Sequence, residues 1–340
     1  MDTPQGMKTA SEGSSARAKH KTHIVGLKEP NQMERLGQLA RGAYERLLEL
    51  ELSGTPSHVA VIQDGNRRYA RQQGDDASEG HRAGAETTEQ VLEWCRETGI
   101  DELTLYTFST ENFDRPEEEN EALFDLLCEK LREFADADRV HDSEVRIRAI
   151  GETGKLPERV REAIDYAERR TAGYDNLQLN IALAYGGRAE LLSAARDVTS
   201  EVDRGALGAG DIDVETIEDR LYEGPSRDVD LIVRTGGDER TSNFLPWHAN
   251  GNEAAVYFCT PYWPEFRKVD FLRAIRTYEH REESWRKTRA RRALALVRAL
   301  GGTEVNDARR VLRRFKDALP SAEREAIESE TDAEFERTAD

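Results

Sequence analysis

Short apolar runs alternate with helical patterns along most of this chain, and that alternation constrains the fold more than any other feature. Six runs are rich in β-branched or apolar side chains and predict strands, at 58–62, 103–108, 145–150, 177–184, 229–233 and 255–258. Between them, apolar residues recur at helical spacing over 84–98, 119–137, 157–171, 189–203 and 214–222. Such alternation is typical of a mostly parallel sheet flanked by helices. We therefore predict an α/β fold with about six strands.

The two ends of the chain lack this alternation. Residues 1–31 are rich in Ser, Gly, Lys and Thr without a hydrophobic period, so we expect a disordered leader. An amphipathic helix is expected over 32–52, and long charged helices after residue 270. The basic stretch 286–292 indicates a solvated helical face, with docking to anionic lipid as the alternative. These features divide the chain into a leader (1–31), a main domain (32–285) and a helical C-terminal extension with an acidic tail (286–340).

Acidic residues dominate the composition. The 340 residues include 67 Asp plus Glu and 49 Lys plus Arg, so the net charge is -18, and only nine of the basic residues are lysines. Proteins from a salty cytoplasm have such surfaces, because strong screening weakens the repulsion between like charges. We predict that folding and activity need molar salt. The same charge excludes a general nucleic-acid binder, which needs a dense basic surface.

Cysteine usage and hydropathy restrict the cellular setting. Cys95, Cys128 and Cys259 lie far apart without metal-ligand spacing, so neither a zinc site nor a disulfide framework is predicted. No window reaches the roughly 18 apolar residues of a membrane span, and the N-terminus has no apolar signal core. We expect a cytoplasmic protein that is neither secreted nor integral to a membrane.

Polar segments follow three of the predicted strands, where ligands bind in open parallel sheets. The first strand continues into Gln63–Tyr69, the second into Ser109–Pro116, and the fifth into Arg234–Asn243. Each segment combines arginine with hydroxyl or amide side chains, which are good hydrogen-bond donors to phosphate. By itself the first segment could be a simple turn. Together the three segments predict one sheet edge that binds one or two diphosphates.

The first of these segments contains the residue types that a phosphate site needs. Gly65 lets the backbone approach a phosphate closely, and a helix that follows would offer free N–H groups. Arg67 and Arg68 supply charge-assisted donors. Asp64 then remains as a hard oxygen ligand for Mg²⁺.

Taken in order, the motifs resemble those of the cis-prenyltransferases, also known as undecaprenyl or dehydrodolichyl diphosphate synthases. The resemblance extends from about Met33 to Arg281 and depends on five segments, 58–68, 80–84, 108–116, 180–188 and 234–247. An ordered set of motifs is far more specific than any one of them. The resemblance implies an undecaprenyl diphosphate synthase-like fold with a hydrophobic tunnel. It also implies that 32–285 is the catalytic domain, and the acidic composition indicates a haloarchaeal-type member of the family.

The activity that this resemblance implies is chain elongation. Isopentenyl diphosphate units would be added in cis to an allylic primer, geranylgeranyl or farnesyl diphosphate. The long-chain polyprenyl diphosphate formed would be the precursor of a glycosyl carrier lipid. Mg²⁺ is the implied cofactor and a homodimer the implied assembly. Because the product has a long apolar tail, peripheral contact with the inner face of the membrane is also implied.

The resemblance assigns roles to individual residues. Asp64 would be catalytic and metal-binding, and Asn112 would help to remove a proton from the new allylic carbon. Glu253 would be a second metal ligand, although an insertion leaves Ala255 as the alternative match. Leu177 would lie at the tunnel floor and influence product length. The implied substrate-binding residues are Gly65, Asn66, Arg67, Arg68, Tyr69, His81, Ser109, Thr110, Glu111, Phe113, Arg115, Arg234, Arg240, Thr241 and Ser242.

Several of these assignments have a structural alternative. An amide is a poor base, so a diphosphate oxygen could accept the proton while Asn112 only positions groups. Phe113 and Tyr69 could contact the isoprenoid or pack in the core, and the same holds for Leu177.

Other functions are less compatible with the sequence. Trans-prenyl synthases are helical and carry Asp-Asp-x-x-Asp motifs, which this chain lacks, and Gly151–Leu156 does not have the spacing of a P-loop. The remaining rival is a non-catalytic partner subunit that keeps the fold without turnover. The joint presence of Asp64, Asn112 and Arg234 favours an enzyme.

Overall fold

The computed structural model describes residues 32–221, 228–249 and 253–299. The predicted leader (1–31) and residues 300–340 of the predicted C-terminal extension, with its acidic tail, lie outside the described residues. The chain divides into two compact units, 1–42 and 43–340. The described part of the first unit is the beginning of helix α1 (Gln32–Glu51), whereas the whole sheet belongs to the second unit.

Six parallel strands form one sheet in the order β3-β4-β2-β1-β5-β6, which confirms the predicted α/β fold. The strands are β1 (His58–Ile62), β2 (Glu102–Tyr106), β3 (Val145–Ile150), β4 (Leu177–Ala182), β5 (Leu231–Arg234) and β6 (Ala255–Phe258). Strand β2 ends earlier than expected because the Thr107 and Phe108 amides both donate to the Ala182 carbonyl. Strand β1 lies between β2 and β5, so the chain segments after all three meet at one edge.

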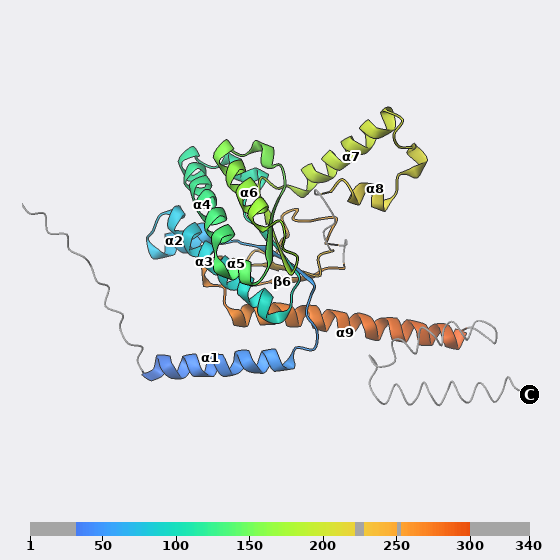
Figure 1. Ribbon diagram of the computed structural model, residues 1–340. Coiled ribbons are helices and arrows are strands. Elements are labelled where there is room, and N and C mark those ends of the chain that lie inside the picture. The colour runs from blue at the N-terminus through green and yellow to red at the C-terminus, as the bar shows by residue number, and fades with distance from the viewer. Residues whose placement is uncertain (1–31, 222–227, 250–252, 300–340) are drawn as a thin grey trace, which may run out of the picture. The chain divides into compact units, whose positions relative to one another are not determined.

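Helices connect the strands at the predicted places (Figure 1). After α1, the α-helices among the described residues are α2 (Asn66–Gln73), α3 (Ala77–Thr98), α4 (Glu117–Asp136), α5 (Asp138–Asp142), α6 (Glu158–Thr171), α7 (Gly187–Asp203), α8 (Val214–Glu218) and α9 (Lys268–Ala299). Short 3₁₀ turns are η1 (Thr110–Asp114), η2 (Thr153–Lys155), η3 (Ala209–Asp211) and η4 (Trp263–Glu265). Helix α3 begins seven residues before the predicted start, because Gly80 and Gly84 let it pack closely against α2.

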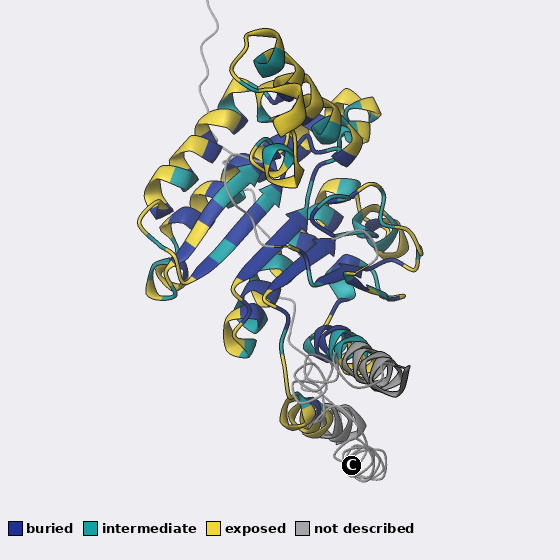
Figure 2. Cartoon of the chain, turned by 90° about the vertical axis from the view of Figure 1, so that its right-hand side faces the viewer, coloured by how far each residue is buried: buried dark blue, intermediate teal, exposed yellow. Residues whose placement is uncertain are grey.

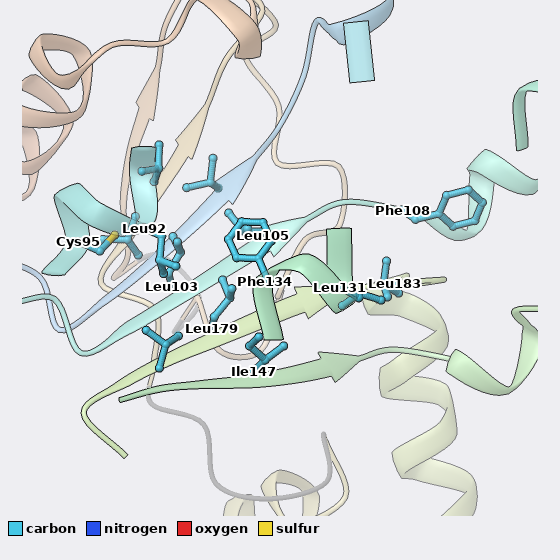
Figure 3. Close-up of a cluster of buried hydrophobic side chains, with 14 of the residues drawn as sticks. Leu92, Cys95, Leu103, Leu105, Phe108, Leu131, Phe134, Ile147, Leu179 and Leu183 are labelled. Carbon is cyan, nitrogen blue, oxygen red and sulfur yellow. The ribbon is translucent and has the colours of Figure 1, made fainter. Parts of the chain in front are cut away.

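One face of the sheet packs against helices α3, α4, α6 and α9. Side chains alternate across a strand, so Val59 and Val61 of β1 point to this face together with Leu103 and Leu105 of β2. Figure 2 shows that these strands are mostly buried, and Figure 3 shows Leu105 and Leu179 gathered with Phe134 of α4. Burial of this apolar surface is the main source of stability.

The opposite face has a smaller apolar cluster and a buried polar network. Ala60, Ile62 and Ile232 pack against Phe244 and Leu245, which follow β5. The network links the three strands β1, β2 and β4 through hydrogen bonds among His58, Glu102, Thr104 and Asn180. The His58 Nε2 and Thr104 Oγ1 atoms are 2.7 Å apart, and Asn180 Nδ2 donates to Glu102 Oε1 at 2.5 Å. These polar groups tolerate burial because they are paired.

The three cysteine side chains belong to the buried core. Cys95, Cys128 and Cys259 are all buried and free. Over the described residues, none of the helices has the length and apolar character needed to cross a membrane.

Candidate active site

Asp64 and Arg234 meet at the carboxyl edge of the sheet. Asp64 lies just after β1 and Arg234 ends β5, and the register between the strands pairs Ile62 with Arg234. Arg234 Nη2 donates to Asp64 Oδ2 at 2.7 Å, and Arg68 Nη2 donates to Asp64 Oδ1 at 2.9 Å. The predicted convergence of the first and fifth strand segments is therefore confirmed.

These contacts keep the Asp64 carboxyl ionised. Burial by itself would raise its pKa, but hydrogen bonds and charge from Arg234 and Arg68 outweigh burial and lower the pKa below its usual value. The side chain is still 27% exposed. Asp64 is thus an ionised, hard oxygen donor that a divalent cation can reach.

A glycine makes the turn after β1 possible. Gly65 has a φ of 106°, and a Cβ at this position would lie 2.6 Å from the Tyr262 side chain. Thr235 holds the turn, because its hydroxyl donates to the Asp64 carbonyl at 2.7 Å and accepts from the Asp64 N–H at 3.1 Å. Helix α2 begins at Asn66, so its free N–H groups lie at this edge, where they can bind an anion.

Arg234 organises the segment after β5. Its side chain is only 4% exposed, and Nη1 donates to the Arg240 carbonyl at 2.6 Å and to Ser242 Oγ at 2.7 Å. Ser242 and Asn243 have φ angles of 51° and 56°, which residues other than glycine rarely adopt. The Arg240 side chain is 66% exposed and pairs with Asp238 at 3.1 Å. A buried arginine thus holds a strained loop that presents Ser242 and a second arginine.

Two glycines place His81 next to the start of α2. A Cβ at Gly80 would lie 2.2 Å from the Asn66 carbonyl oxygen, and a Cβ at Gly84 would lie 2.4 Å from Asn66 Oδ1. In the described part of the chain, neither His81 Nε2 nor Asn66 Oδ1 has a hydrogen-bond partner, although both are buried. Burial lowers the pKa of His81 to about 4, and nearby Arg115 and Arg67 contribute. His81 therefore lines the site as a neutral imidazole, and its Nε2 atom makes no hydrogen bond within the described residues.

Glu119 joins the segment after β2 to helix α2. Its Oε1 atom lies 3.3 Å from Arg67 Nε and 3.3 Å from Arg115 Nη1. All three predicted segments therefore converge. We did not predict Glu119 from the sequence, although an acidic residue in the first turn of a helix is a recognisable signal.

The remaining residues of the second segment have local contacts. Asn112 Oδ1 accepts a hydrogen bond from the Ser109 N–H at 3.0 Å, which caps η1. Phe113 packs edge-on against Phe108, with ring centroids 4.9 Å apart, so the structure favours its core interpretation. Glu111 is exposed, whereas Tyr69, Thr110 and Thr241 are half-buried.

An apolar cavity of about 100 Å³ begins at this edge and runs between the sheet and helices α3 and α4. Asn66 and His81 line its start, and the residues deeper inside are mostly apolar, including Leu105, Leu131, Phe134 and Leu179 (Figure 3). Leu177 does not line the cavity. It is 2% exposed and precedes Leu179 on the same face of β4, further from the carboxyl edge.

Glu253 lies at the other edge of the sheet. It precedes β6, and the register pairs Ala255 with Leu231 at the start of β5, so Glu253 is at the amino edge. There it lines a small pocket with Asp228. The structure does not bring Glu253 to Asp64, and the arrangement within one chain gives no support to the predicted second metal ligand. Within the described ranges, no three His, Cys, Asp or Glu residues gather as a preformed metal site.

An anion-binding edge that opens directly into an apolar cavity fits an amphipathic ligand with a diphosphate head and a hydrocarbon tail. Residues 62–286 match the prenyltransferase family model described as "Putative undecaprenyl diphosphate synthase". The chain therefore belongs to the undecaprenyl diphosphate synthase family, and it is a prenyltransferase.

Relatives and solved structures agree with this assignment. The chain is 71% identical over 295 residues to the tritrans,polycis-undecaprenyl-diphosphate synthase (geranylgeranyl-diphosphate specific) of Haloarcula marismortui, covering 87% of this chain and 97% of the relative. It is 69% identical to the protein of the same description from Halobacterium salinarum, over 87% of this chain and 98% of the relative. The crystal structure of lavandulyl diphosphate synthase from Lavandula x intermedia in complex with dimethylallyl diphosphate superposes with a TM-score of 0.61 at 32% identity. That comparison covers 66% of this chain and 95% of the other.

Proposed function

We propose that this protein adds isopentenyl diphosphate units in cis to geranylgeranyl diphosphate, forming a long-chain polyprenyl diphosphate for a glycosyl carrier lipid. The observation that carries the proposal is the Asp64–Arg234 edge and its direct opening into the apolar cavity. The choice of primer is supported by the haloarchaeal relatives, which are described as geranylgeranyl-diphosphate specific.

The two diphosphates bind to different parts of the edge in this proposal. The primer diphosphate lies at the start of α2, where Gly65 allows the backbone to approach it closely. The side chains of Arg67, Arg68 and His81 lie near this point and can bind it. Its hydrocarbon tail enters the cavity. Isopentenyl diphosphate binds on the β5 side, where Arg234 presents Ser242 and Arg240 is exposed. Charge-assisted hydrogen bonds from arginine suit both diphosphates.

Asp64 fits the role of a Mg²⁺ ligand. It is ionised and partly exposed, and Mg²⁺ is usually held by one or two carboxylates together with substrate phosphates and water. A bound Mg²⁺ would supply positive charge to the primer diphosphate as it leaves. The neighbouring carboxylate of Asp238 is already paired, because it contacts Arg240 and Arg234.

The chain's own residues then position the reacting groups. The bond between the allylic carbon and the primer diphosphate breaks, the alkene of isopentenyl diphosphate forms the new carbon–carbon bond, and a proton leaves. Arg67, Arg68 and the α2 N–H groups stabilise the charge on the leaving diphosphate. Because Asn112 Oδ1 already accepts from Ser109, we assign Asn112 a positioning role and the proton to a diphosphate oxygen.

Product analysis tests this function. The purified protein is incubated in molar KCl with Mg²⁺, labelled isopentenyl diphosphate and either farnesyl or geranylgeranyl diphosphate. We expect long cis-polyprenyl diphosphates, formed best from geranylgeranyl diphosphate and lost in Asp64→Ala. The control Asp175→Ala removes an exposed carboxylate at the opposite edge and keeps activity. No incorporation with either primer, across salt and metal conditions, would favour the non-catalytic partner subunit.

We also propose a homodimer that contacts the membrane peripherally. Exposed apolar side chains on the α7–α8 region, Leu192, Ile212 and Val214, support a contact surface between copies. Light scattering in molar KCl should give twice the mass of the chain, and co-sedimentation with lipid vesicles tests the membrane contact. A monomer at micromolar concentration, or protein that stays in the supernatant, contradicts the respective proposal.

We also propose that the catalytic domain comprises residues 32–285. Helix α9 contributes Phe271, Ala274 and Ile275 to the core, so the catalytic domain must include the beginning of this helix. A chain that ends at residue 285 should retain activity, and loss of folding in that truncation would contradict the boundary.

A further inference from the structure

A charged side chain lines the deep part of the apolar cavity. Lys130 of α4 lies among Leu127, Leu131 and Phe134 and is the one Lys, Arg, Asp or Glu among the described lining residues, whereas Gln63, Asn66 and His81 are at the diphosphate end. Diphosphate binding does not explain a charged residue in this apolar part of the cavity, so Lys130 has another role.

Ion pairs connect Lys130 to its own helix and to α3. Its Nζ atom lies 2.7 Å from Glu133 Oε2 on the same helix and 3.5 Å from Glu89 Oε1 on α3. Arg139 of α5 pairs with the other oxygen of Glu89 at 2.6 Å. The Lys130 and Glu89 side chains are only 18% and 19% exposed, so solvent screens this pair less than an ordinary surface pair.

The charge of Lys130 persists in this setting. Burial would lower its pKa, but Glu133 and Glu89 outweigh burial and raise the pKa. A long lysine side chain can cover apolar surface with its methylene groups while its ammonium group reaches charged partners. The stem of Lys130 thus forms part of the cavity wall, and its ammonium group fastens α4 to Glu89 on α3.

The present cavity is too small for a long product. Its volume of about 100 Å³ is less than the ~150 Å³ of an apolar cavity that binds one benzene molecule. For the hydrocarbon chain to grow inside this cavity one wall must move outward, and the wall between α3 and α4 is the one that the Lys130–Glu89 pair spans. The Lys130–Glu89 pair connects these two helices at the deep end of the cavity, so separation there must stretch or break the pair.

We propose that Lys130, through its pair with Glu89, limits how far the cavity opens and so determines product length. This inference rests on the proposed function. In this arrangement Lys130 is a specificity-determining residue that touches the growing hydrocarbon with its stem. Removal of its charge should let the far wall open further and shift products to greater length.

Three variants at this pair test the inference by product length. Lys130→Met keeps an unbranched apolar stem without the charge, and Glu89→Gln removes the charge of the partner on α3. Both should lengthen the main product by at least one isoprene unit, with little change in the rate of the first condensation. Lys130→Arg keeps the charge and should give wild-type products.

A neighbouring ion pair provides a matched control. Glu129 precedes Lys130 on α4 and pairs with Arg82 of α3 at 3.1 Å, but both side chains are about half exposed and Glu129 does not line the cavity. Glu129→Gln should therefore leave product length unchanged. Equal lengthening in this control would overturn the role of Lys130, because any weakened contact between the helices would then suffice.

The outcomes separate the inference from the proposed function. If Lys130→Met and Glu89→Gln elongate the primer to wild-type length, the inference is overturned and the function stands. If the wild-type protein itself forms no polyprenyl product, the proposed function fails and the inference fails with it. Thermal unfolding of each variant checks that a changed product does not reflect an unfolded protein.

Discussion

Asp64 competes with substrate for the two arginines of the active site. In the structure Arg234 and Arg68 both donate to its carboxylate, so a diphosphate that binds these arginines must displace or repel Asp64. Without a metal ion, the carboxylate therefore opposes substrate binding. We predict that Asp64→Asn abolishes turnover but tightens the metal-free binding of isopentenyl diphosphate.

The size of this effect follows from the geometry. Arg234 Nη2 lies 2.7 Å from Asp64 Oδ2, and a diphosphate oxygen at hydrogen-bond distance from the same guanidinium group would place a negative charge about 5 Å from the carboxylate. At an effective dielectric constant of about 20, two unit charges at this distance repel by about 3 kcal/mol. Molar salt screens exposed charges strongly, and Asp64 is 27% exposed, so we retain about half of that energy. About 1.5 kcal/mol corresponds to a roughly tenfold lower Kd.

Calorimetric titration with isopentenyl diphosphate in EDTA and constant molar KCl measures this Kd. The control Asp175→Asn removes the same charge from an exposed position at the opposite edge of the sheet, and its Kd should equal that of the wild type. An unchanged or weaker Kd in Asp64→Asn would refute the competition between Asp64 and substrate.

Four further predictions concern packing, pH, salt and product length. Gly84→Ala places a Cβ 2.4 Å from Asn66 Oδ1, so urea unfolding should show a loss of about 1–3 kcal/mol; unchanged stability would mean that α2 and α3 can separate freely. The pKa of His81 is about 4 when folded and about 6.5 when unfolded, so protons favour the unfolded state. Between pH 6.5 and pH 4 the wild type should lose about 3 kcal/mol of stability relative to His81→Gln, and parallel pH profiles would contradict this. Transfer from molar KCl to dilute buffer should lower Tm and activity, and full activity in dilute buffer would exclude the salt requirement. Leu177 does not line the cavity but lies beyond the lining residue Leu179 on the same face of β4, so Leu177→Ala should lower the free energy of unfolding by about 3 kcal/mol and lengthen the product by adding space there; products of unchanged length would leave Leu177 a core residue only.

Much of the fold could be predicted because its signals are local. The runs that form β1, β3 and β6 have the predicted bounds, because each is a short run rich in β-branched or apolar residues between polar or turn residues. The meeting of the Asp64 and Arg234 segments could also be predicted. Parallel strands place all their carboxyl ends at one edge, however far apart the segments lie in the sequence.

Tertiary packing decided the contacts that adjust the site. The sequence does not reveal that Asn112 caps a turn, that Glu119 bridges two arginines, or that Lys130 fastens α4 to α3. Each of these contacts depends on the separation and rotation of packed elements. Spacing along the chain does not encode those distances.

Glu253 shows most clearly the difference between what the sequence determines and what the tertiary structure decides. The family resemblance assigns it as a metal ligand, but the register of β5 and β6 places it at the amino edge of the sheet. The sequence by itself determined the α/β fold, the acidic surface and the residue types at the diphosphate edge, because these follow from periodicity, charge and short motifs. Only the tertiary structure decided that Glu253 lies away from this edge and which side chains enclose the cavity, because both depend on how the elements pack in three dimensions.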